Sequence, residues 1–165
     1  MTKVVVSSVF AIMIAVLMNG PAQAQGGSGA AFEKRNFSYN EWSKGRFSEV
    51  VTVTNPGKFI FVAGIGPEQE GDGKIVFAGD FIAQCRFAFQ KIKKYLGMHG
   101  ATISDIVKMT VYMTDIRYFT SSEWGKCRGE AFGGAPVPTS TLVNVSQLAW
   151  PHMMVEIDVM AVLAK

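Results

Sequence analysis

Residues 79–115, "GDFIAQCRFAFQKIKKYLGMHGATISDIVKMTVYMTD", change their hydrophobic period part-way along. In the first part, apolar side chains recur at steps of three and four residues, which is the spacing of one helix face. This apolar set is Phe81, Cys85, Ala88, Phe89, Ile92 and Tyr95. Lys91 and Lys94 are expected to face the solvent. Because Asp80 is a suitable N-cap and the glycines of "GMHG" are stop signals, the sequence predicts an amphipathic helix between them.

After this helix the period changes to two, which is typical of a strand with one face in the core. The apolar face would carry Val107, Met109, Val111 and Met113. The opposite face would carry Lys108, Thr110, Tyr112 and Thr114. We expect the apolar set to pack against the helices and the polar set to lie on the other side of the sheet.

The C-terminal stretch "MMVEIDVMAVLA" (residues 153–164) predicts another strand with an unusual second face. One face is purely apolar and consists of Met153, Val155, Ile157, Val159 and Ala161. The other face carries Glu156 and Asp158, roughly 7 Å apart, between methionine and valine side chains. Such a face is neither an ordinary core nor an ordinary solvent surface.

Three further elements complete the prediction. Residues 47–53 and 59–64 are β-branched and aromatic runs, and the Pro-Gly pair between them suits a type II turn, so we expect a β-hairpin. Residues 117–133 predict a second helix that Gly125 weakens. Residues 137–149 predict a strand in which Val143 and Val145 face the core.

The resulting order, ββαβαββ, predicts an α+β fold with two helices on one face of the sheet. The uncovered face would carry apolar side chains among polar groups. They are Tyr112, Leu142, Met154, Met160 and Val162. This is more apolar area than a monomer normally leaves exposed, so the pattern predicts an oligomer.

The N-terminal residues have the order of a secretory signal peptide. A basic start at Lys3 precedes an apolar run and the small-x-small site Ala22-Gln23-Ala24. The run is shorter than the roughly 20 residues that a spanning helix needs, although an uncleaved anchor stays an alternative. We predict a signal peptide over residues 1–24, a flexible segment over 25–45, and one domain over 46–165. The mature protein would be periplasmic or secreted, with no stable membrane anchor.

Composition excludes several functional classes. The net charge of +3 is weak, and no Lys/Arg cluster has interleaved aromatic residues, so no nucleic acid partner is expected. His99 and His152 stand alone in predicted loops, and no metal or other cofactor is expected. Export would allow Cys85 and Cys127 to pair. Their pairing cannot be established from sequence, and we expect free thiols.

Three segments resemble the YjgF/RidA family. Residues 79–115 match its D-x-x-x-Q helix start and its D-I-V-K-x-T-V-Y-x-x-D strand. "VEIDVMA" (155–161) looks like its V-E-I-E-x-x-A, and "FVAGIGP" (61–67) looks like its strand ending in S-G-Q-x-P. The resemblance covers residues 46–163. It implies a chorismate mutase-like fold and a homotrimer that binds small-molecule ligands in clefts between subunits.

The resemblance also implies hydrolysis of reactive imines and enamines to 2-keto acids. That chemistry needs a cation for the substrate carboxylate and a carboxyl group to activate water. Glu156 matches the family's glutamate, but Ser140 stands where active members have the arginine of P-x-R-S. Losing such a charged contact removes about 1.5–3 kcal/mol, so a neutral or cationic imine is the expected substrate. Three further family positions also differ, at Ala63, Leu142 and Glu123.

The candidate site thus consists of Glu156 as the catalytic group, with Gly64, Ser140, Thr141 and Glu123 as substrate-binding residues. Two functions stay open: an imine hydrolase, or a non-catalytic trimer that binds a small molecule in the same cleft. Glu156 and Asp158 have a structural alternative, which is pairing across the trimer with Lys108 or with hydroxyl groups. RNA cleavage, reported for some relatives, is disfavoured by the weak charge and the lack of a catalytic histidine pair.

Overall fold

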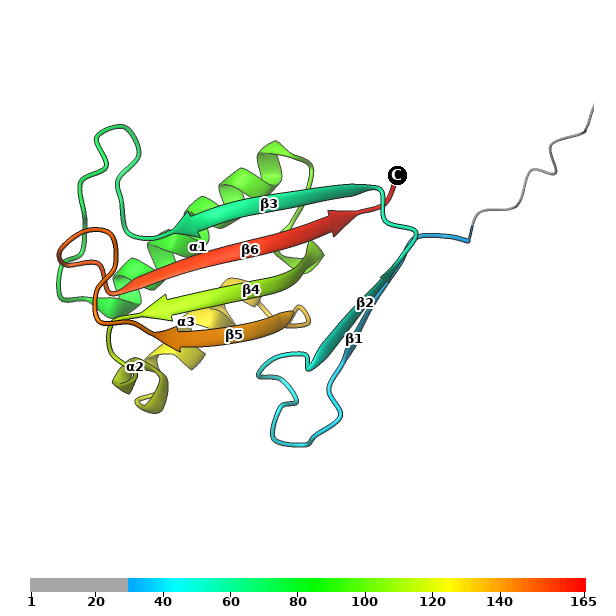
Figure 1. Cartoon of the computed structure of the whole chain (residues 1–165), viewed down its shortest axis with the longest axis horizontal. Helices are drawn as coiled ribbons and strands as arrows, with labels where there is room; N and C mark the ends of the chain where they lie inside the picture. Colours follow the sequence, from blue (N-terminus) through cyan, green and yellow to red (C-terminus); the bar gives the residue numbers. More distant parts are fainter. Residues whose placement is uncertain (1–29) are drawn as a thin grey trace, which may run out of the picture.

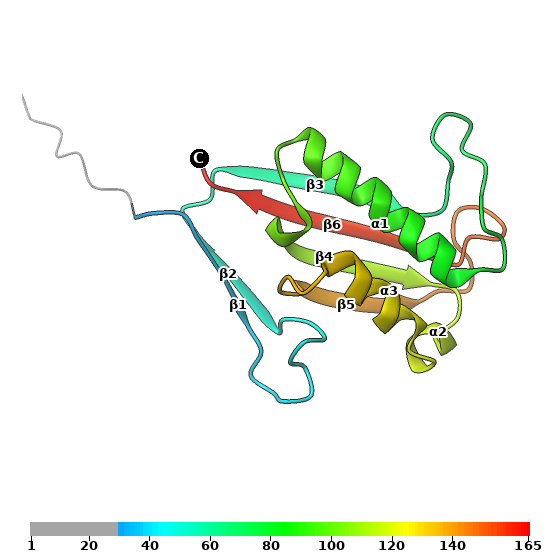
Figure 2. The ribbon, with the colours of Figure 1, turned by 180° about the vertical axis from the view of Figure 1, so that it is seen from behind.

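The structure is a computed structural model that describes residues 30–165, so the predicted signal peptide lies outside the described residues. The strands are β1 (Glu33–Phe37), β2 (Val50–Thr54), β3 (Lys58–Ile65), β4 (Ile106–Met113), β5 (Thr139–Asn144) and β6 (Val155–Leu163). The helices are α1 (Phe81–Met98), the 3₁₀ turn η1 (Ile103–Asp105), α2 (Arg117–Thr120) and α3 (Glu123–Phe132). Figure 2 shows α1 and α3 on one face of a sheet, which confirms the predicted α+β class. Between residues 30 and 165, no helix is both long and apolar enough to span a membrane.

The larger sheet has four strands in the order β3-β6-β4-β5 (Figure 1). Strand β6 runs antiparallel to both β3 and β4, whereas β4 and β5 are parallel. Parallel neighbours need a crossover connection, and α2 and α3 supply it on the covered face. Because β6 lies between β3 and β4, the acid-bearing strand is an inner strand of the sheet.

The predicted hairpin between residues 47–53 and 59–64 is wrong. Strand β2 pairs instead with β1, in a separate two-stranded sheet that stands away from the larger one (Figure 1). Asn55, with a φ of 50°, turns the chain between β2 and β3. The backbone N–H of Gly57 then donates to the carbonyl of Leu163 at 2.9 Å, so the chain enters β3 already hydrogen-bonded to β6. Strand β1 also forms within the segment that was predicted to be flexible.

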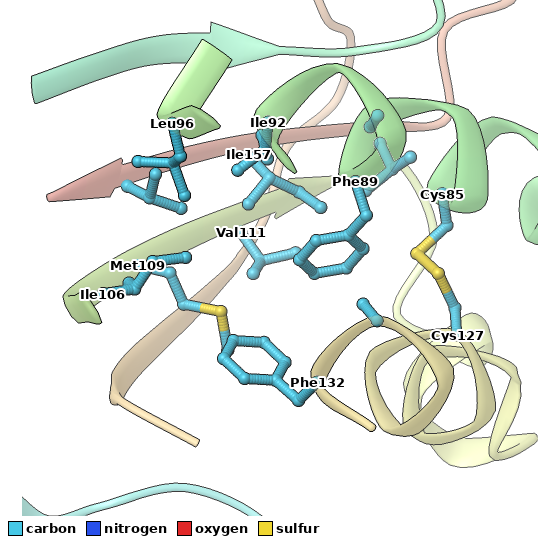
Figure 3. Packing of buried hydrophobic residues seen from close by; sticks show 14 of the residues in the cluster. Cys85, Phe89, Ile92, Leu96, Ile106, Met109, Val111, Cys127, Phe132 and Ile157 are labelled. Carbon is cyan, nitrogen blue, oxygen red and sulfur yellow. A yellow bond between two sulfur atoms is a disulfide. The ribbon is translucent and has the colours of Figure 1, made fainter. Parts of the chain in front are cut away.

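The core lies between the larger sheet and the helices, as Figure 3 shows. The predicted inner face of β4 is confirmed at Met109, Val111 and Met113, which are fully buried. It is wrong at Val107, because a register irregularity between Ile106 and Lys108 puts Ile106 in the core instead. The apolar face of β6 is confirmed in the same way. Asp80 caps α1 as predicted, since its Oδ1 accepts a hydrogen bond from the backbone N–H of Ala83.

Lys91 is buried, although its position in the helix pattern predicted a solvent-facing side chain. Its Nζ donates to the carboxylate of Glu68 at 2.9 Å and to the backbone carbonyl of the same residue at 2.6 Å. The backbone N–H of Gly66 also donates to this carboxylate, at 3.0 Å. The loop after β3 therefore covers Lys91, a long-range arrangement that a helix pattern does not encode.

The second predicted helix is divided at Ser122, which adopts a left-handed φ of 69°, so α2 and α3 are separate. Gly125, the expected weak point, lies inside α3. Trp124, at the start of α3, is buried and stacks with Phe89.

A disulfide joins Cys85 on α1 to Cys127 on α3, so the expectation of free thiols is wrong. Both residues are buried, and their Cα atoms lie 6.3 Å apart, within the range that a disulfide requires. Figure 3 shows the bond between the two helices at the edge of the core. It ties together the two elements that cover the sheet.

Candidate functional site

The face of the larger sheet that points away from the helices carries the two acids of β6. Side chains of directly paired residues lie on the same face of a sheet. Glu156 pairs with Tyr112, and Asp158 pairs with Thr110, which in turn pairs with Thr141. Figure 1 looks onto this face, and no helix within residues 30–165 covers it. Glu156, Asp158 and Thr141 therefore share one uncovered surface.

Gly64 lies directly beside Glu156. A Cβ atom added at Gly64 would lie 2.0 Å from Oε1 of Glu156 and 2.7 Å from its Cδ. The position needs no left-handed backbone, so the close approach of the carboxyl group is what requires glycine. The structure thus brings together two of the predicted site residues, and the glutamate side chain occupies the space that a larger residue would fill.

Ser140 and Glu123 are placed elsewhere. Ser140 pairs with the buried Met109, so its side chain lies on the helix-covered face of the edge strand β5. The same register puts Leu142 against Val111 and turns Val143 toward the uncovered face, opposite to the predicted orientation. Glu123 lies in the first turn of α3 and accepts a hydrogen bond from Oγ of Ser121 at 2.8 Å. Within one chain, neither side chain shares a surface with Glu156.

Burial and neighbouring acids raise the pKa of Glu156. The largest cause is loss of solvent around the carboxyl group, followed by the negative charges of Glu68 and Asp158. Within residues 30–165, the Glu156 side chain has neither an ion-pair partner nor a hydrogen-bond donor. A half-buried carboxyl group with a raised pKa binds a proton more readily than an ordinary glutamate, which suits it to accept and return one during a reaction.

Two aromatic side chains that were not among the predicted site residues lie at the β3 edge of this surface. Phe61 pairs with Met160, and Phe59 pairs with Val162. The two rings are stacked and are 49% (Phe59) and 72% (Phe61) exposed. In "KFIFV" the two phenylalanines alternate with an isoleucine, which would have placed both rings on one face of a strand. The predicted hairpin rested instead on the Pro-Gly turn that precedes this run. Together with Met160, these rings give the surface an apolar margin beside the acids.

Lys108 lies on the same surface as Glu156, but it is engaged elsewhere. Its ammonium group donates to the hydroxyl of Thr141. It pairs in register with Met160, four positions along β4 from the partner of Glu156. Among the residues that the structure describes, no group of three or more histidine, cysteine or acidic side chains could hold a metal ion.

A family model described as endoribonuclease L-PSP matches residues 40–163. The chain belongs to the YjgF/RidA family. A RutC family protein of Pyrococcus abyssi is 34% identical over 117 residues, covering 71% of this chain and 86% of the relative. Membership agrees with the resemblance seen in the sequence motifs.

Solved structures of YjgF/RidA family proteins have the same fold. The Rid family protein YyfB of Yersinia pestis, whose function is unknown, matches with a TM-score of 0.67 and 25% identity, over 79% of this chain and 98% of its own. TdcF of E. coli, solved with bound serine, matches with a TM-score of 0.57 and 25% identity, over 67% and 87% of the two chains. Because the names of these relatives state no common activity, membership alone does not name the substrate.

Proposed function

We propose that this chain is an exported, trimeric member of the YjgF/RidA family that hydrolyses small imines or enamines in clefts between subunits. The observation that carries the proposal is the position of Glu156. Its carboxyl group lies over Gly64 on an uncovered surface, with a raised pKa and without a cationic partner in the described chain. A carboxyl group that packs closely over a glycine and is left unpaired is free to act on a bound water.

In the proposed reaction Glu156 acts as general base and then as general acid. The carboxylate takes a proton from water while the water oxygen bonds to the carbon of the C=N group. Glu156 returns this proton to the nitrogen, which gives a carbinolamine. The carboxylate then takes the proton of the carbinolamine hydroxyl and delivers it to the amine nitrogen, so that the C–N bond breaks and ammonia leaves as the carbonyl forms. The raised pKa of Glu156 favours the return of the proton, because a weaker acid is protonated more readily near neutral pH.

The charges around the site favour a substrate without a carboxylate. Asp158 and Glu68 both act on Glu156 as negative neighbours. Ser140, which stands at the position of the family arginine, has no charge to offset them. A neutral or cationic imine avoids this repulsion, whereas a 2-imino acid carries its own negative charge toward three carboxyl groups.

Two observations support the assembly and the location. The exposed Phe59 and Phe61 give the uncovered surface the apolar margin that an interface between copies needs. The Cys85–Cys127 disulfide supports an oxidising compartment, as expected for a chain exported by the predicted signal peptide. The mature protein would then be periplasmic or secreted and would begin at residue 25.

The test uses residues 25–165 in a competition assay. An amino-acid oxidase supplies imines that carry a carboxylate, a flavin amine oxidase supplies imines that lack one, and semicarbazide traps what is not hydrolysed. We expect faster hydrolysis, with a preference of about tenfold to a hundredfold for imines without a carboxylate, equivalent to the missing arginine contact. A preference for acidic 2-imino acids would contradict the substrate class.

The non-catalytic alternative makes a different prediction in the same assay. A chain that forms a trimer by light scattering but accelerates hydrolysis of no imine would be a binding protein. A monomer would remove the basis for a cleft between subunits. Either result would overturn the proposed hydrolase.

A further inference from the structure

A cavity of about 540 Å³ lies near the β5 edge of the larger sheet, whereas Gly64 lies on β3 at the opposite edge. Its walls are the segment before β2, the C-terminal half of α3 and the residues that lead into β5. Ser48 links the segment before β2 to the residues that lead into β5, because its backbone N–H and its hydroxyl both donate to the carbonyl of Val137. None of the residues that line this cavity belongs to the Glu156 surface, so the two are separate sites within one chain.

Arg128 on α3 lines this cavity and is the only side chain with an unsatisfied buried polar atom among residues 30–165. Its Nε is buried and donates to no acceptor in the described chain. Leaving a buried donor of a charged group unpaired is costly, so native proteins rarely keep one without a function. The guanidinium group also lacks an acidic partner, since no ion pair involves it in the described part of the chain.

The nearest charges do not neutralise Arg128. Loss of solvent and the positive charge of Arg46 both lower the pKa of its guanidinium group. Lys44 also lines the cavity and is paired with Glu41. The C-terminal end of α3 contributes a partial charge of only about −0.5, less than the full charges of the two arginines.

Nearby acids have other partners. Glu130, on the same helix as Arg128, forms a two-contact ion pair with Arg86 at 2.7 and 2.8 Å. Glu49, which precedes β2, accepts hydrogen bonds from the backbone of Tyr39 and from Asn40. The cavity is therefore a positively charged space whose one buried donor is unused.

We propose that this cavity binds a small oxyanion, a carboxylate or a phosphate group, through the guanidinium fork of Arg128. A guanidinium group offers parallel N–H donors that match two oxygens of such a group, and the buried Nε supplies one of them. The charge of Arg46, which acts on Arg128, adds to the positive potential around the guanidinium group. The site goes beyond the proposed hydrolysis, because it uses none of the residues around Glu156.

The test is a titration of the intact mature protein, followed through the ¹H–¹⁵N signals of its arginine Nε groups. Inorganic phosphate and acetate are added in separate experiments, which distinguishes a phosphate site from a carboxylate site. The Arg128 signal is assigned by its loss in Arg128→Lys. We expect this signal to shift and saturate with at least one of the two anions. The titration itself uses the wild-type protein, and Arg128→Lys serves only to assign the signal.

Affinity for the better anion is then compared by calorimetry in two variants. Arg128→Gln should weaken binding at least tenfold, because it removes the fork and its charge. Lys126→Gln removes the same charge from an exposed position of the same helix and should leave the affinity within about twofold. Absence of a saturable shift with both anions, or equal affinity in Arg128→Gln and the wild type, would overturn the proposal.

Discussion

Glu156→Gln is expected to slow imine hydrolysis by a factor of about 100 to 10,000, the usual contribution of a positioned general acid or base. The amide keeps the size of the side chain, so the packing over Gly64 is retained while the group that moves the proton is lost. The rate is measured with the imine that wild-type protein hydrolyses fastest, across pH 5–9. Because burial raises the pKa of Glu156, the wild-type hydrolysis rate should change with pH at a point above the range in which an ordinary glutamate titrates.

Asp158→Asn is the matched control for this variant. It removes the same charge from the same face of β6, where Asp158 accepts a hydrogen bond from the backbone N–H of Thr110. It also lowers the pKa of Glu156, because one of the negative neighbours is removed. We expect activity to be retained, and we expect the change of hydrolysis rate with pH to occur at a lower pH than in the wild type. Equal losses in both variants would show that Glu156 has no special role.

Removal of the Cys85–Cys127 disulfide is expected to lower the free energy of unfolding by about 4 kcal/mol, because the bond closes a long loop in the unfolded chain. The sequence separation of the two cysteines is 42 residues. The variant is Cys85→Ala with Cys127→Ala, since alanine leaves no buried polar group. Urea unfolding of both proteins at equal concentration gives the difference, which keeps any effect of assembly constant.

The control for the disulfide is the wild-type protein under reducing conditions. Reduction should reproduce the loss of stability in the wild type and leave the double variant unchanged. A wild-type unfolding midpoint that does not respond to reduction would mean that the two thiols are not paired in the purified protein.

The fold was predictable wherever local pattern and long-range packing agree. The periods of α1, β4 and β6 are strong because each element buries one continuous apolar face. The pairing of β2 was not predictable, because a Pro-Gly pair suits a hairpin as well as the bend that the structure contains. Lys91 was misplaced for a similar reason, since its partner Glu68 lies on a loop that no periodic pattern describes.

The candidate site was predictable in part. Alternation along β6 placed Glu156 on the face opposite the core, and the family motif pointed to Gly64 beside it. Alternation gave the wrong parity for β5, because a short edge strand is partly buried on both faces and its pattern is weak. Arg128 left no signal in the sequence, since only the folded chain shows that its Nε has no acceptor.

The most direct test of the central claim, that Glu156 acts from its position over Gly64, is the imine hydrolysis rate of Gly64→Ala. The added methyl group would lie 2.0 Å from Oε1 of Glu156, so the carboxyl group must move although the catalytic residue is intact. We expect a loss of about a hundredfold, because a displacement of about 1 Å is enough for that. Gly97→Ala, at a helical position with no atom within 4 Å of the added carbon, is the control and should keep full activity. Wild-type activity in Gly64→Ala would contradict the claim.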